Sequence, residues 1–484
     1  MRILMLDLDT LRPDHLGCYG YLRNTSPNID IVADDGICFT NYYCSDAPCL
    51  PSRTALMSGR FGIHTGVVNH GGEAADMRLL GSKRGFKDFI AKECLPAVLQ
   101  EAGLRTVSIS GFAEHHANWT FYAGFSEIYN TKRLGLDSYK VYPIVEDWLN
   151  RNAEDDNWFL HVNFWDAHTP YRTPEDFGNP FENEPIEDFF NEEFLEKTKN
   201  AVGPHSAKDL NMYDDKEFSF LPRAIGSFQD MKGLKKFIDG YDCGIRFMDE
   251  YIGKIINILK DKGIYEETAI IITADHGENF GELDIFGEHA TADYATCHLP
   301  FILKWPGGRK GVKEPSMRYH LDLLPTFAEL LDMPESPRWD GESYKDCIFQ
   351  ENIPGRNEII LSQCSHTCQR AVLFDNYLYI RTYHDGYHLF PKEMLFDLKN
   401  DIKEQKNIAK EHLEICKEAT YRYLKWHDDM MMSMDYVIDP LWTVMKEGGP
   451  FHCRGELSKY IDRLEKTGRK EGANELRKRH PKDL

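Results

Sequence analysis

The prediction of this fold starts from twelve consecutive residues, Cys49-Leu50-Pro51-Ser52-Arg53-Thr54-Ala55-Leu56-Met57-Ser58-Gly59-Arg60. Proline has the backbone angle of a first helical turn and lacks an N–H group, so Pro51 predicts a helix that starts there. Cys49 is then expected just outside the helix N-terminus, where unpaired N–H groups favour negative charge. Arg53 follows one turn later on the same face. The stretch therefore predicts a nucleophile beside a cationic side chain that can hold an oxyanion.

The same stretch resembles the signature of type I sulfatases, in which proline follows the cysteine by two residues and arginine follows it by four. In that family a sulfatase-maturating enzyme oxidises the cysteine to formylglycine after translation. Met57-Ser58-Gly59-Arg60 is similar to the second part of the signal that this enzyme reads. The resemblance implies an alkaline-phosphatase-like fold and a sulfuric ester hydrolase with formylglycine at position 49. The alternative is an ordinary buried thiol ahead of a helix.

Apolar runs alternate with amphipathic segments through the first two thirds of the chain. Buried strands are expected at residues 2–9, 105–110, 158–164, 268–274 and 299–304, and helices at 97–102, 233–262 and 321–332. This alternation is typical of an α/β fold with a large, mostly parallel central sheet sandwiched by helices. In such sheets the chemistry gathers at the carboxyl ends of the strands.

The pattern changes after residue 345, where shorter β-rich runs occur at 358–361, 371–374 and 376–381 and a helix is expected near 411–427. We therefore expect a catalytic domain over 1–345 and a smaller C-terminal subdomain with an antiparallel sheet over 346–484. Residues 172–232 interrupt the alternation with prolines and with Asn, Asp and Glu clusters, which indicates an insertion near the active site. The alternative is a surface loop without a role.

Composition limits the partners and the compartment. The 484-residue chain has a net charge of −21, so a nucleic-acid partner is not expected. No apolar run reaches the length that spans a bilayer, so no membrane partner is expected either. The chain begins without a recognisable signal peptide, and its twelve cysteines lack paired spacing, which together predict a cytoplasmic protein with reduced thiols. Cys364-Ser365-His366-Thr367-Cys368 contains metal-ligand residue types but lacks a second half, so no structural zinc is predicted there.

Two predicted strands end in carboxylates. Asp9 ends the first, and Asp275-His276 ends the strand at 268–274. A carboxylate at the end of an apolar strand is costly unless it is paired or binds a cation. These residues therefore predict a metal site, with helix capping as the alternative for each aspartate.

The sulfatase resemblance covers these positions as well. It implies Asp9, Asp275, His276 and the modified Cys49 as metal ligands. Where the family usually has a second aspartate after the first, this chain has Thr10, and Asp7 on the same strand face is a candidate replacement. The family's usual metal is calcium, which favours oxygen ligands, and one fewer carboxylate leaves manganese or magnesium open.

The substrate pocket is expected to be rich in histidine. Trp165-Asp166-Ala167-His168-Thr169-Pro170 resembles a family segment whose histidine faces the bridging oxygen of the ester, which implies that His168 protonates the leaving alcohol. His289 occupies the place of a sulfate-binding lysine. The family's other lysine–histidine motif is absent, and His115-His116 stands in that region. We expect one of these two to act as a base, provisionally His116, and the other to bind substrate.

The implied reaction is hydrolysis of a sulfate ester by hydrated formylglycine, with Arg53 and His289 holding the sulfuryl oxygens. The expected substrate is a sulfated mono- or oligosaccharide, partly because His384, Tyr387 and His388 suggest a sugar pocket. Two alternatives remain open. One is a phosphonate monoester or phosphodiester hydrolase of the same superfamily, and the other is a catalytically inactive homologue that binds sulfated glycans.

Overall fold

The computed structural model describes residues 1–80, 88–131, 135–435 and 438–484. The strands of its larger sheet are β1 (Arg2–Leu8), β2 (Ile37–Tyr43), β4 (Arg105–Ile109), β5 (Glu127–Tyr129), β6 (Trp158–Phe164), β7 (Thr268–Thr273), β8 (His298–Lys304), β9 (Val312–Glu314) and β10 (Arg318–Tyr319). Their order is β10-β2-β8-β7-β1-β6-β4-β5, with β9 beside β2. Within the described sheet only β8 runs antiparallel to its neighbours. The mostly parallel sheet and all five of its expected strands are confirmed.

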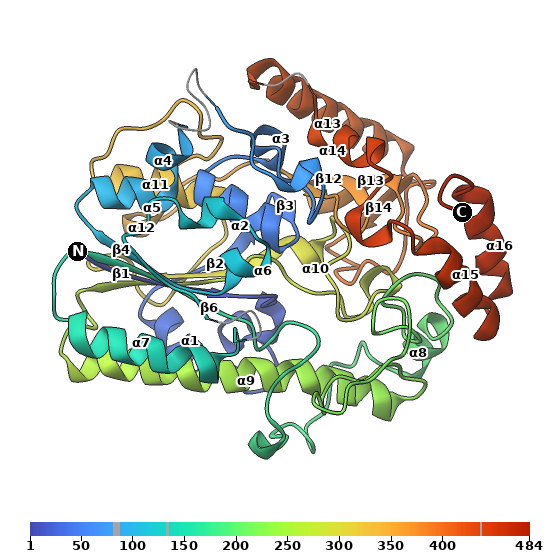
Figure 1. The fold of residues 1–484 in the computed structure, drawn as a ribbon, viewed down its shortest axis with the longest axis horizontal. Coiled ribbons are helices and arrows are strands. Elements are labelled where there is room, and N and C mark those ends of the chain that lie inside the picture. The colour runs from blue at the N-terminus through green and yellow to red at the C-terminus, as the bar shows by residue number, and fades with distance from the viewer. Residues whose placement is uncertain (81–87, 132–134, 436–437) are drawn as a thin grey trace.

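Helices cover both faces of this sheet, as Figure 1 shows. One face carries α1 (Pro27–Asp34), α7 (Ser138–Asn152) and α9 (Met231–Asp261), and the other carries α2 (Cys49–Ser58), α4 (Ile90–Glu93), α5 (Leu95–Glu101) and α11 (Leu323–Leu330). The helices expected at 97–102, 233–262 and 321–332 correspond to α5, α9 and α11. In the described part of the chain, no helix combines the length and apolar character needed to cross a bilayer.

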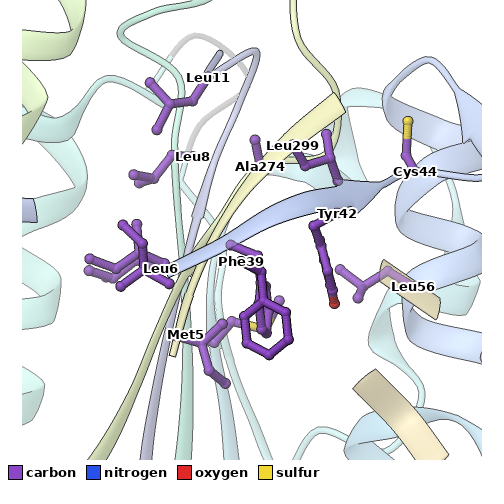
Figure 2. Close-up of a cluster of buried hydrophobic side chains, with 14 of the residues drawn as sticks. Met5, Leu6, Leu8, Leu11, Phe39, Tyr42, Cys44, Leu56, Ala274 and Leu299 are labelled. Carbon is purple, nitrogen blue, oxygen red and sulfur yellow. The ribbon is translucent and has the colours of Figure 1, made fainter. Parts of the chain in front are cut away.

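The central strand β1 is buried along its whole length and separates two apolar layers (Figure 2). Side chains alternate across a strand, so Met5 and Asp7 share one face while Leu6 and Leu8 share the other. Arg53 of α2 bonds to Asp7, which places the Met5 face against α2. Asp7 is therefore an ionisable group on an otherwise apolar buried face, and it needs a cationic partner there.

The smaller sheet has the order β14-β13-β12-β11-β3. Its strands are β3 (Asp46–Ala47), β11 (Glu358–Gln363), β12 (Cys368–Phe374), β13 (Tyr377–His384) and β14 (Glu393–Asp397). The four C-terminal strands pair antiparallel, as expected. The helix expected near 411–427 is α13 (Leu413–Ser433). Because β3 pairs with β11 and lies just before α2, the C-terminal sheet is attached directly to the segment that carries Cys49.

The segment 172–232 is mostly irregular and contains η5 (Glu175–Phe177) and α8 (Glu192–Thr198). It leads into α9 and supplies residues to the cavity described below, among them His205, Met212 and Phe218. All twelve cysteines are free thiols.

Candidate active site

The candidate residues meet at the carboxyl edge of four adjacent parallel strands. Asp9 follows β1, Asp275 and His276 follow β7, and His168 lies in the loop after β6. His115 ends the short helix α6 (Phe112–His115), which follows β4. Since β4, β6, β1 and β7 are consecutive in the sheet, their carboxyl ends bring these side chains together.

Cys49 is the first residue of α2, so the helix begins two residues earlier than Pro51 suggested. Pro48 precedes the helix and its carbonyl accepts the bond from the Ser52 N–H, which extends the helical turn back over Cys49. The Cys49 Sγ lies 3.2 Å from His276 Nε2. Burial raises the pKa of the Cys49 thiol well above its usual value, and Asp9 and Asp275 raise it further. An unmodified thiol here stays protonated at neutral pH, which makes it a poor nucleophile.

Four side chains form a candidate metal site. One ligand atom from each of Asp9, Cys49, Asp275 and His276 lies within 4.8 Å of the others, and all four residues are buried. Burial lowers the pKa of His276 well below its usual value, so its imidazole is neutral and able to bind a metal. Two carboxylates, one neutral imidazole and the side chain at position 49 are a donor set that fits a divalent cation.

Thr10 supports this group at the position where the resemblance to sulfatases implies a second aspartate. Its hydroxyl donates to Asp9 Oδ1 at 2.7 Å, and its N–H donates to Asp275 Oδ1 at 3.2 Å. Thr10 has a φ of 63°, a left-handed conformation that is rare for a β-branched residue. Such strain is held in place by surrounding contacts and is concentrated at functional sites. Thr10 therefore orients both carboxylates without adding a charge.

Asp7 does not join the candidate ligands. It accepts two hydrogen bonds from Arg53, from Nε at 2.7 Å and from Nη2 at 3.0 Å, and lies 3.3 Å from His161 Nε2. Burial raises the pKa of Asp7, but Arg53 and His161 lower it more strongly, so it stays ionised. Asp7 anchors Arg53, and it is not part of the group formed by Asp9, Cys49, Asp275 and His276.

Arg53 lies where the sequence did not lead us to expect it. Its Nη1 donates to Asp9 Oδ2 at 2.8 Å and to Asp275 Oδ2 at 2.6 Å, and its side chain is only 1% exposed. The guanidinium also lies 4.3 Å above the centre of the Phe112 ring. Three carboxylates attract Arg53 into the protein, so it does not line the cavity as a substrate-binding residue would. Its position favours a role in organising the carboxylates.

A cavity of about 280 Å³ opens above this group. Cys49, His115, His116, His168 and His289 all line it, so the expected substrate-facing residues lie together. Among the described residues, four further histidines that the sequence did not single out as site residues also line it: His70, His205, His366 and His452. No local motif groups these four, because each comes from a separate segment; only His366 lies in a stretch that the sequence marked, Cys364–Cys368.

His168 is fixed against an aromatic wall. Its ring stacks on Trp165 at 5.1 Å between centroids, and its Nε2 lies 3.9 Å from Asp9 Oδ1. Burial lowers the pKa of His168 to about 4 and outweighs the raising effect of Asp9. An anionic ligand in the cavity would add negative charge beside the ring, which favours the protonated form.

His289 and Glu288 form a second part of the wall. The His289 ring lies 4.0 Å from the His276 ring, and its Nδ1 lies 2.9 Å from Glu288 Oε1. His205 Nε2 lies 2.9 Å from Glu288 Oε2. Burial raises the pKa of Glu288, but His289, His366 and His205 lower it more strongly, so the carboxylate is ionised. Where the sequence suggested that His289 replaces a lysine, the structure adds an anionic partner for it.

The adjacent histidines differ in surroundings. His115 packs edge-on against Trp165 at 4.7 Å, and His116 packs against Phe112 at 4.6 Å and against His70 at 5.0 Å. Burial lowers the pKa of His116 well below its usual value, with His115 and Arg53 adding to the effect. A neutral imidazole is the form that accepts a proton, so the position of His116 is compatible with a base.

The suggested sugar pocket at His384, Tyr387 and His388 is wrong, because none of the three is among the residues that line the cavity. Tyr387 packs against the C-terminal helices and donates to the Cys453 carbonyl at 3.0 Å. His388 stacks on Phe390, and His384 lies 3.5 Å from Asp483. These side chains join the C-terminal helices to the smaller sheet, so their aromatic and polar character reflects packing.

Comparison with known proteins gives a consistent result. A family model described as Sulfatase matches residues 3–333, which is more than half of the chain. The chain is 23% identical over 424 residues to an ulvan-active sulfatase of Formosa agariphila, covering 84% of this chain and 76% of that protein. It is 24% identical over 486 residues to the uncharacterized sulfatase YidJ of Escherichia coli, covering 90% and 88%. Human iduronate 2-sulfatase is 24% identical over 378 residues, covering 69% of this chain and 65% of that protein.

Solved structures share the fold. One, described as a complex with its substrate D-glucosamine-2-N,6-O-disulfate, has a TM-score of 0.70 at 17% identity and covers 90% of this chain and 98% of that chain. The phosphonate monoester hydrolase of Agrobacterium radiobacter has a TM-score of 0.69 at 17% identity and covers 89% and 96%. At these identities the likeness shows the architecture.

Proposed function

This chain belongs to the sulfatase family, and on that premise we propose that it hydrolyses sulfate esters carried by a mono- or oligosaccharide. The observation that carries the proposal is the meeting of Cys49 with Asp9, Asp275 and His276 at the wall of a histidine-lined cavity. Family membership establishes a sulfuric ester hydrolase. A saccharide substrate is supported by similarity to an ulvan-active sulfatase, to iduronate 2-sulfatase and to a protein solved in complex with D-glucosamine-2-N,6-O-disulfate.

The first proposed step is assembly of the metal site. Asp9, Asp275 and His276 would hold a divalent cation, and calcium fits two carboxylate oxygens better than a softer metal does. When bound, the cation supplies concentrated positive charge for the sulfuryl oxygens. Arg53 then keeps Asp7 paired and holds Asp9 and Asp275 in orientation, since one guanidinium spans all three carboxylates.

The second proposed step is conversion of Cys49 to formylglycine by a sulfatase-maturating enzyme. The hydrated aldehyde supplies two hydroxyl groups in place of a thiol that burial keeps protonated. His276 Nε2 lies 3.2 Å from the Cys49 Sγ, so the cation that His276 would hold lies next to the group at position 49. The first residue of α2 also faces unpaired helical N–H groups, which favour the negative charge of attack.

The remaining roles fall to the histidines of the cavity. His168 would give its proton to the leaving alcohol, held in orientation by the stacked Trp165. His289 would donate a hydrogen bond to a sulfuryl oxygen, with Glu288 fixing its ring. His116, neutral because it is buried, would accept a proton when sulfate is released. Twelve free thiols support a reducing compartment such as the cytoplasm.

The test combines mass spectrometry of the peptide around Cys49 with release of inorganic sulfate from sulfated monosaccharides and from an aryl sulfate. We expect formylglycine at position 49 and sulfate release that stops when Cys49 is replaced by alanine. Formylglycine combined with cleavage of phosphonate monoesters but not sulfate esters would contradict the proposal. An unmodified cysteine in protein from the native host would remove the mechanism and indicate a binding protein.

A further inference from the structure

Three histidines from distant parts of the chain form a cluster on one side of the cavity. His70 follows the short helix α3 (Gly62–Thr65), His366 lies in the turn between β11 and β12, and His452 lies in the 3-10 turn η8 (Phe451–Cys453). The ring of His452 stacks on that of His366 at 4.1 Å between centroids and lies 5.2 Å from that of His70. One ring nitrogen from each of the three lies within 4.8 Å of the others.

One pair of these nitrogens has the spacing of two ligands on one metal ion. His70 Nδ1 lies 3.0 Å from His452 Nε2. Two nitrogens that bind one tetrahedral zinc, each at about 2.0–2.1 Å, are separated by about 3.3 Å. One shared proton can satisfy only the His70–His452 pair, whereas a cation can bind a nitrogen of the third ring as well.

The protonation state suits metal binding. Burial lowers the pKa of His70 and of His366 well below the usual histidine value, and lowers that of His452 to about 4. All three rings are therefore neutral at pH 7, which is the form that binds a metal. Three neutral imidazoles do not attract one another by charge. Each has a nitrogen lone pair that a cation can bind.

The backbone holds the three rings in place. Asn69 Oδ1 accepts from the N–H of His70 at 2.9 Å and from the N–H of Phe451 at 3.4 Å, so it ties the first segment to the third. The His452 N–H donates to the Ser365 carbonyl at 3.1 Å, which ties the third segment to the second. Tyr213 Oη donates to the His452 carbonyl at 2.8 Å. These bonds fix the backbone segments that carry the three rings relative to one another.

We propose that His70, His366 and His452 form a second metal site, separate from Asp9, Asp275 and His276, that binds Zn²⁺. An all-imidazole set suits zinc or another late transition metal, whereas the carboxylate site suits a harder cation. Three protein ligands leave the fourth position of a tetrahedral zinc open. All three rings line the cavity, so water or an oxygen of the bound substrate can fill that position. Contact with substrate rests on the proposed function; zinc binding does not.

The sequence contained one fragment of this site. His366 lies between Cys364 and Cys368, where the missing second half argued against a structural zinc. In the structure both thiols pack in an apolar cluster with Val68, Leu441 and Val444. The histidine between them faces the cavity, and its partners come from residues 70 and 452. The other proposed ligands are distant in the sequence and come next to His366 only when the chain is folded.

The direct test uses the full chain without substrate. After treatment with a chelator, the protein is saturated with Ca²⁺ and then titrated with Zn²⁺, and bound zinc is counted by elemental analysis. Co²⁺ is titrated in parallel and its visible absorption recorded. We expect one equivalent of tightly bound zinc and the strong absorption of tetrahedral Co²⁺. A protein that binds no zinc beyond the carboxylate site, or that gives only the weak octahedral cobalt spectrum, overturns the proposal without any variant.

Variants assign the metal to the cluster. His366→Asn and His70→Gln are each expected to weaken zinc binding more than about 100-fold, since loss of even an outer partner costs 10–100-fold. Asp275→Asn should leave the zinc equivalent intact, which separates the two sites. The matched control is His298→Asn, a buried histidine on β8 that contacts the Thr40 carbonyl outside the cavity. Unchanged zinc affinity in both cluster variants would refute the site, whether or not sulfate esters are cleaved.

Discussion

Two clusters of side chains near the cavity are built from different chemistry. The carboxylate cluster consists of Asp7, Asp9, Asp275 and Arg53, and its charges are paired through one guanidinium beneath the cavity lining. The imidazole cluster consists of His70, His366 and His452, which line the cavity and whose rings are neutral and crowded. The aspartates of the carboxylate cluster lie in or just after the parallel strands β1 and β7, whereas the imidazole cluster is assembled from three loops. A strand edge fixes charged groups by backbone register, and loops gather polar rings only when the whole chain has folded.

Cys49→Ala gives the largest expected effect, because position 49 lies beside Asp9 and Asp275 of the carboxylate cluster and supplies the nucleophile. Sulfate release should fall about 10⁴-fold or more, in line with the removal of nucleophiles in other hydrolases. Initial rates of sulfate release measure it. Cys94→Ala is the matched control, since Cys94 is a buried thiol in the same apolar cluster. Equal losses in both variants would show that the effect is structural.

His168→Gln tests whether the proton for the leaving alcohol comes from the cavity. With sulfated sugars, whose alcohols are poor leaving groups, kcat/KM should fall about 10²–10⁴-fold. With an aryl sulfate carrying an activated phenol, which needs no proton, the loss should be much smaller. Comparison of the two substrates in one variant is the measurement. A uniform loss across leaving groups would remove His168 from the role of acid.

Arg53→Met removes the cation of the carboxylate cluster. It leaves three buried carboxylates without their cation, so the free energy of unfolding should fall by about 3–5 kcal/mol. Added Ca²⁺ should restore part of the loss, because it can pair Asp9 and Asp275 but not Asp7. Unfolding by denaturant with and without Ca²⁺ measures the free energy of unfolding under each condition.

The control for this variant is Arg370→Met in the smaller sheet. Arg370 is also buried and pairs with Asp439 at 3.0 Å, but it lies away from the candidate metal site. Its loss of stability should not respond to Ca²⁺. A Ca²⁺ response of equal size in both variants would mean that Arg53 has no special relation to the metal ligands.

Asp166→Asn has the smallest expected effect. It tests how a buried carboxylate behaves when no guanidinium is bonded to it. Asp166 lies beside His168 in sequence and, unlike Asp7 and Asp9, bonds to the N–H and hydroxyl of Ser138 rather than to a guanidinium. Burial, with repulsion from Asp137, raises the pKa of Asp166 from 3.8 to about 7. The folded state therefore keeps a proton that the unfolded state has lost across that interval.

The sign of the pH effect follows from that difference. As pH rises from 3.8 to about 7, the stability contributed by Asp166 falls, by at most about 1.4 kcal/mol per pH unit. Asp166→Asn should flatten this slope, and thermal unfolding of both proteins over the same pH series measures it. Identical pH profiles for the two proteins would show that Asp166 is ionised in the folded state despite its burial.

The residues that sequence reasoning could place share one property: each stands at a strand end or within a continuous motif. Asp9, Cys49, Asp275 and His276 were expected together, and the parallel sheet brings them within 4.8 Å of one another. The roles of Arg53 and Asp7 could not be assigned in the same way. Which carboxylate accepts a guanidinium and which faces a metal depends on side-chain direction, and the spacing of residues does not specify that.

The sequence by itself determined the family, the mostly parallel sheet, the smaller antiparallel sheet and the set of residues at the strand edge, because alternation and local motifs encode these features within short windows. Only the tertiary structure decided that His70, His205, His366 and His452 line one cavity and that His384, Tyr387 and His388 do not. The physical reason is distance along the chain. A site made from residues hundreds of positions apart depends on how the loops pack, and no local pattern records that packing.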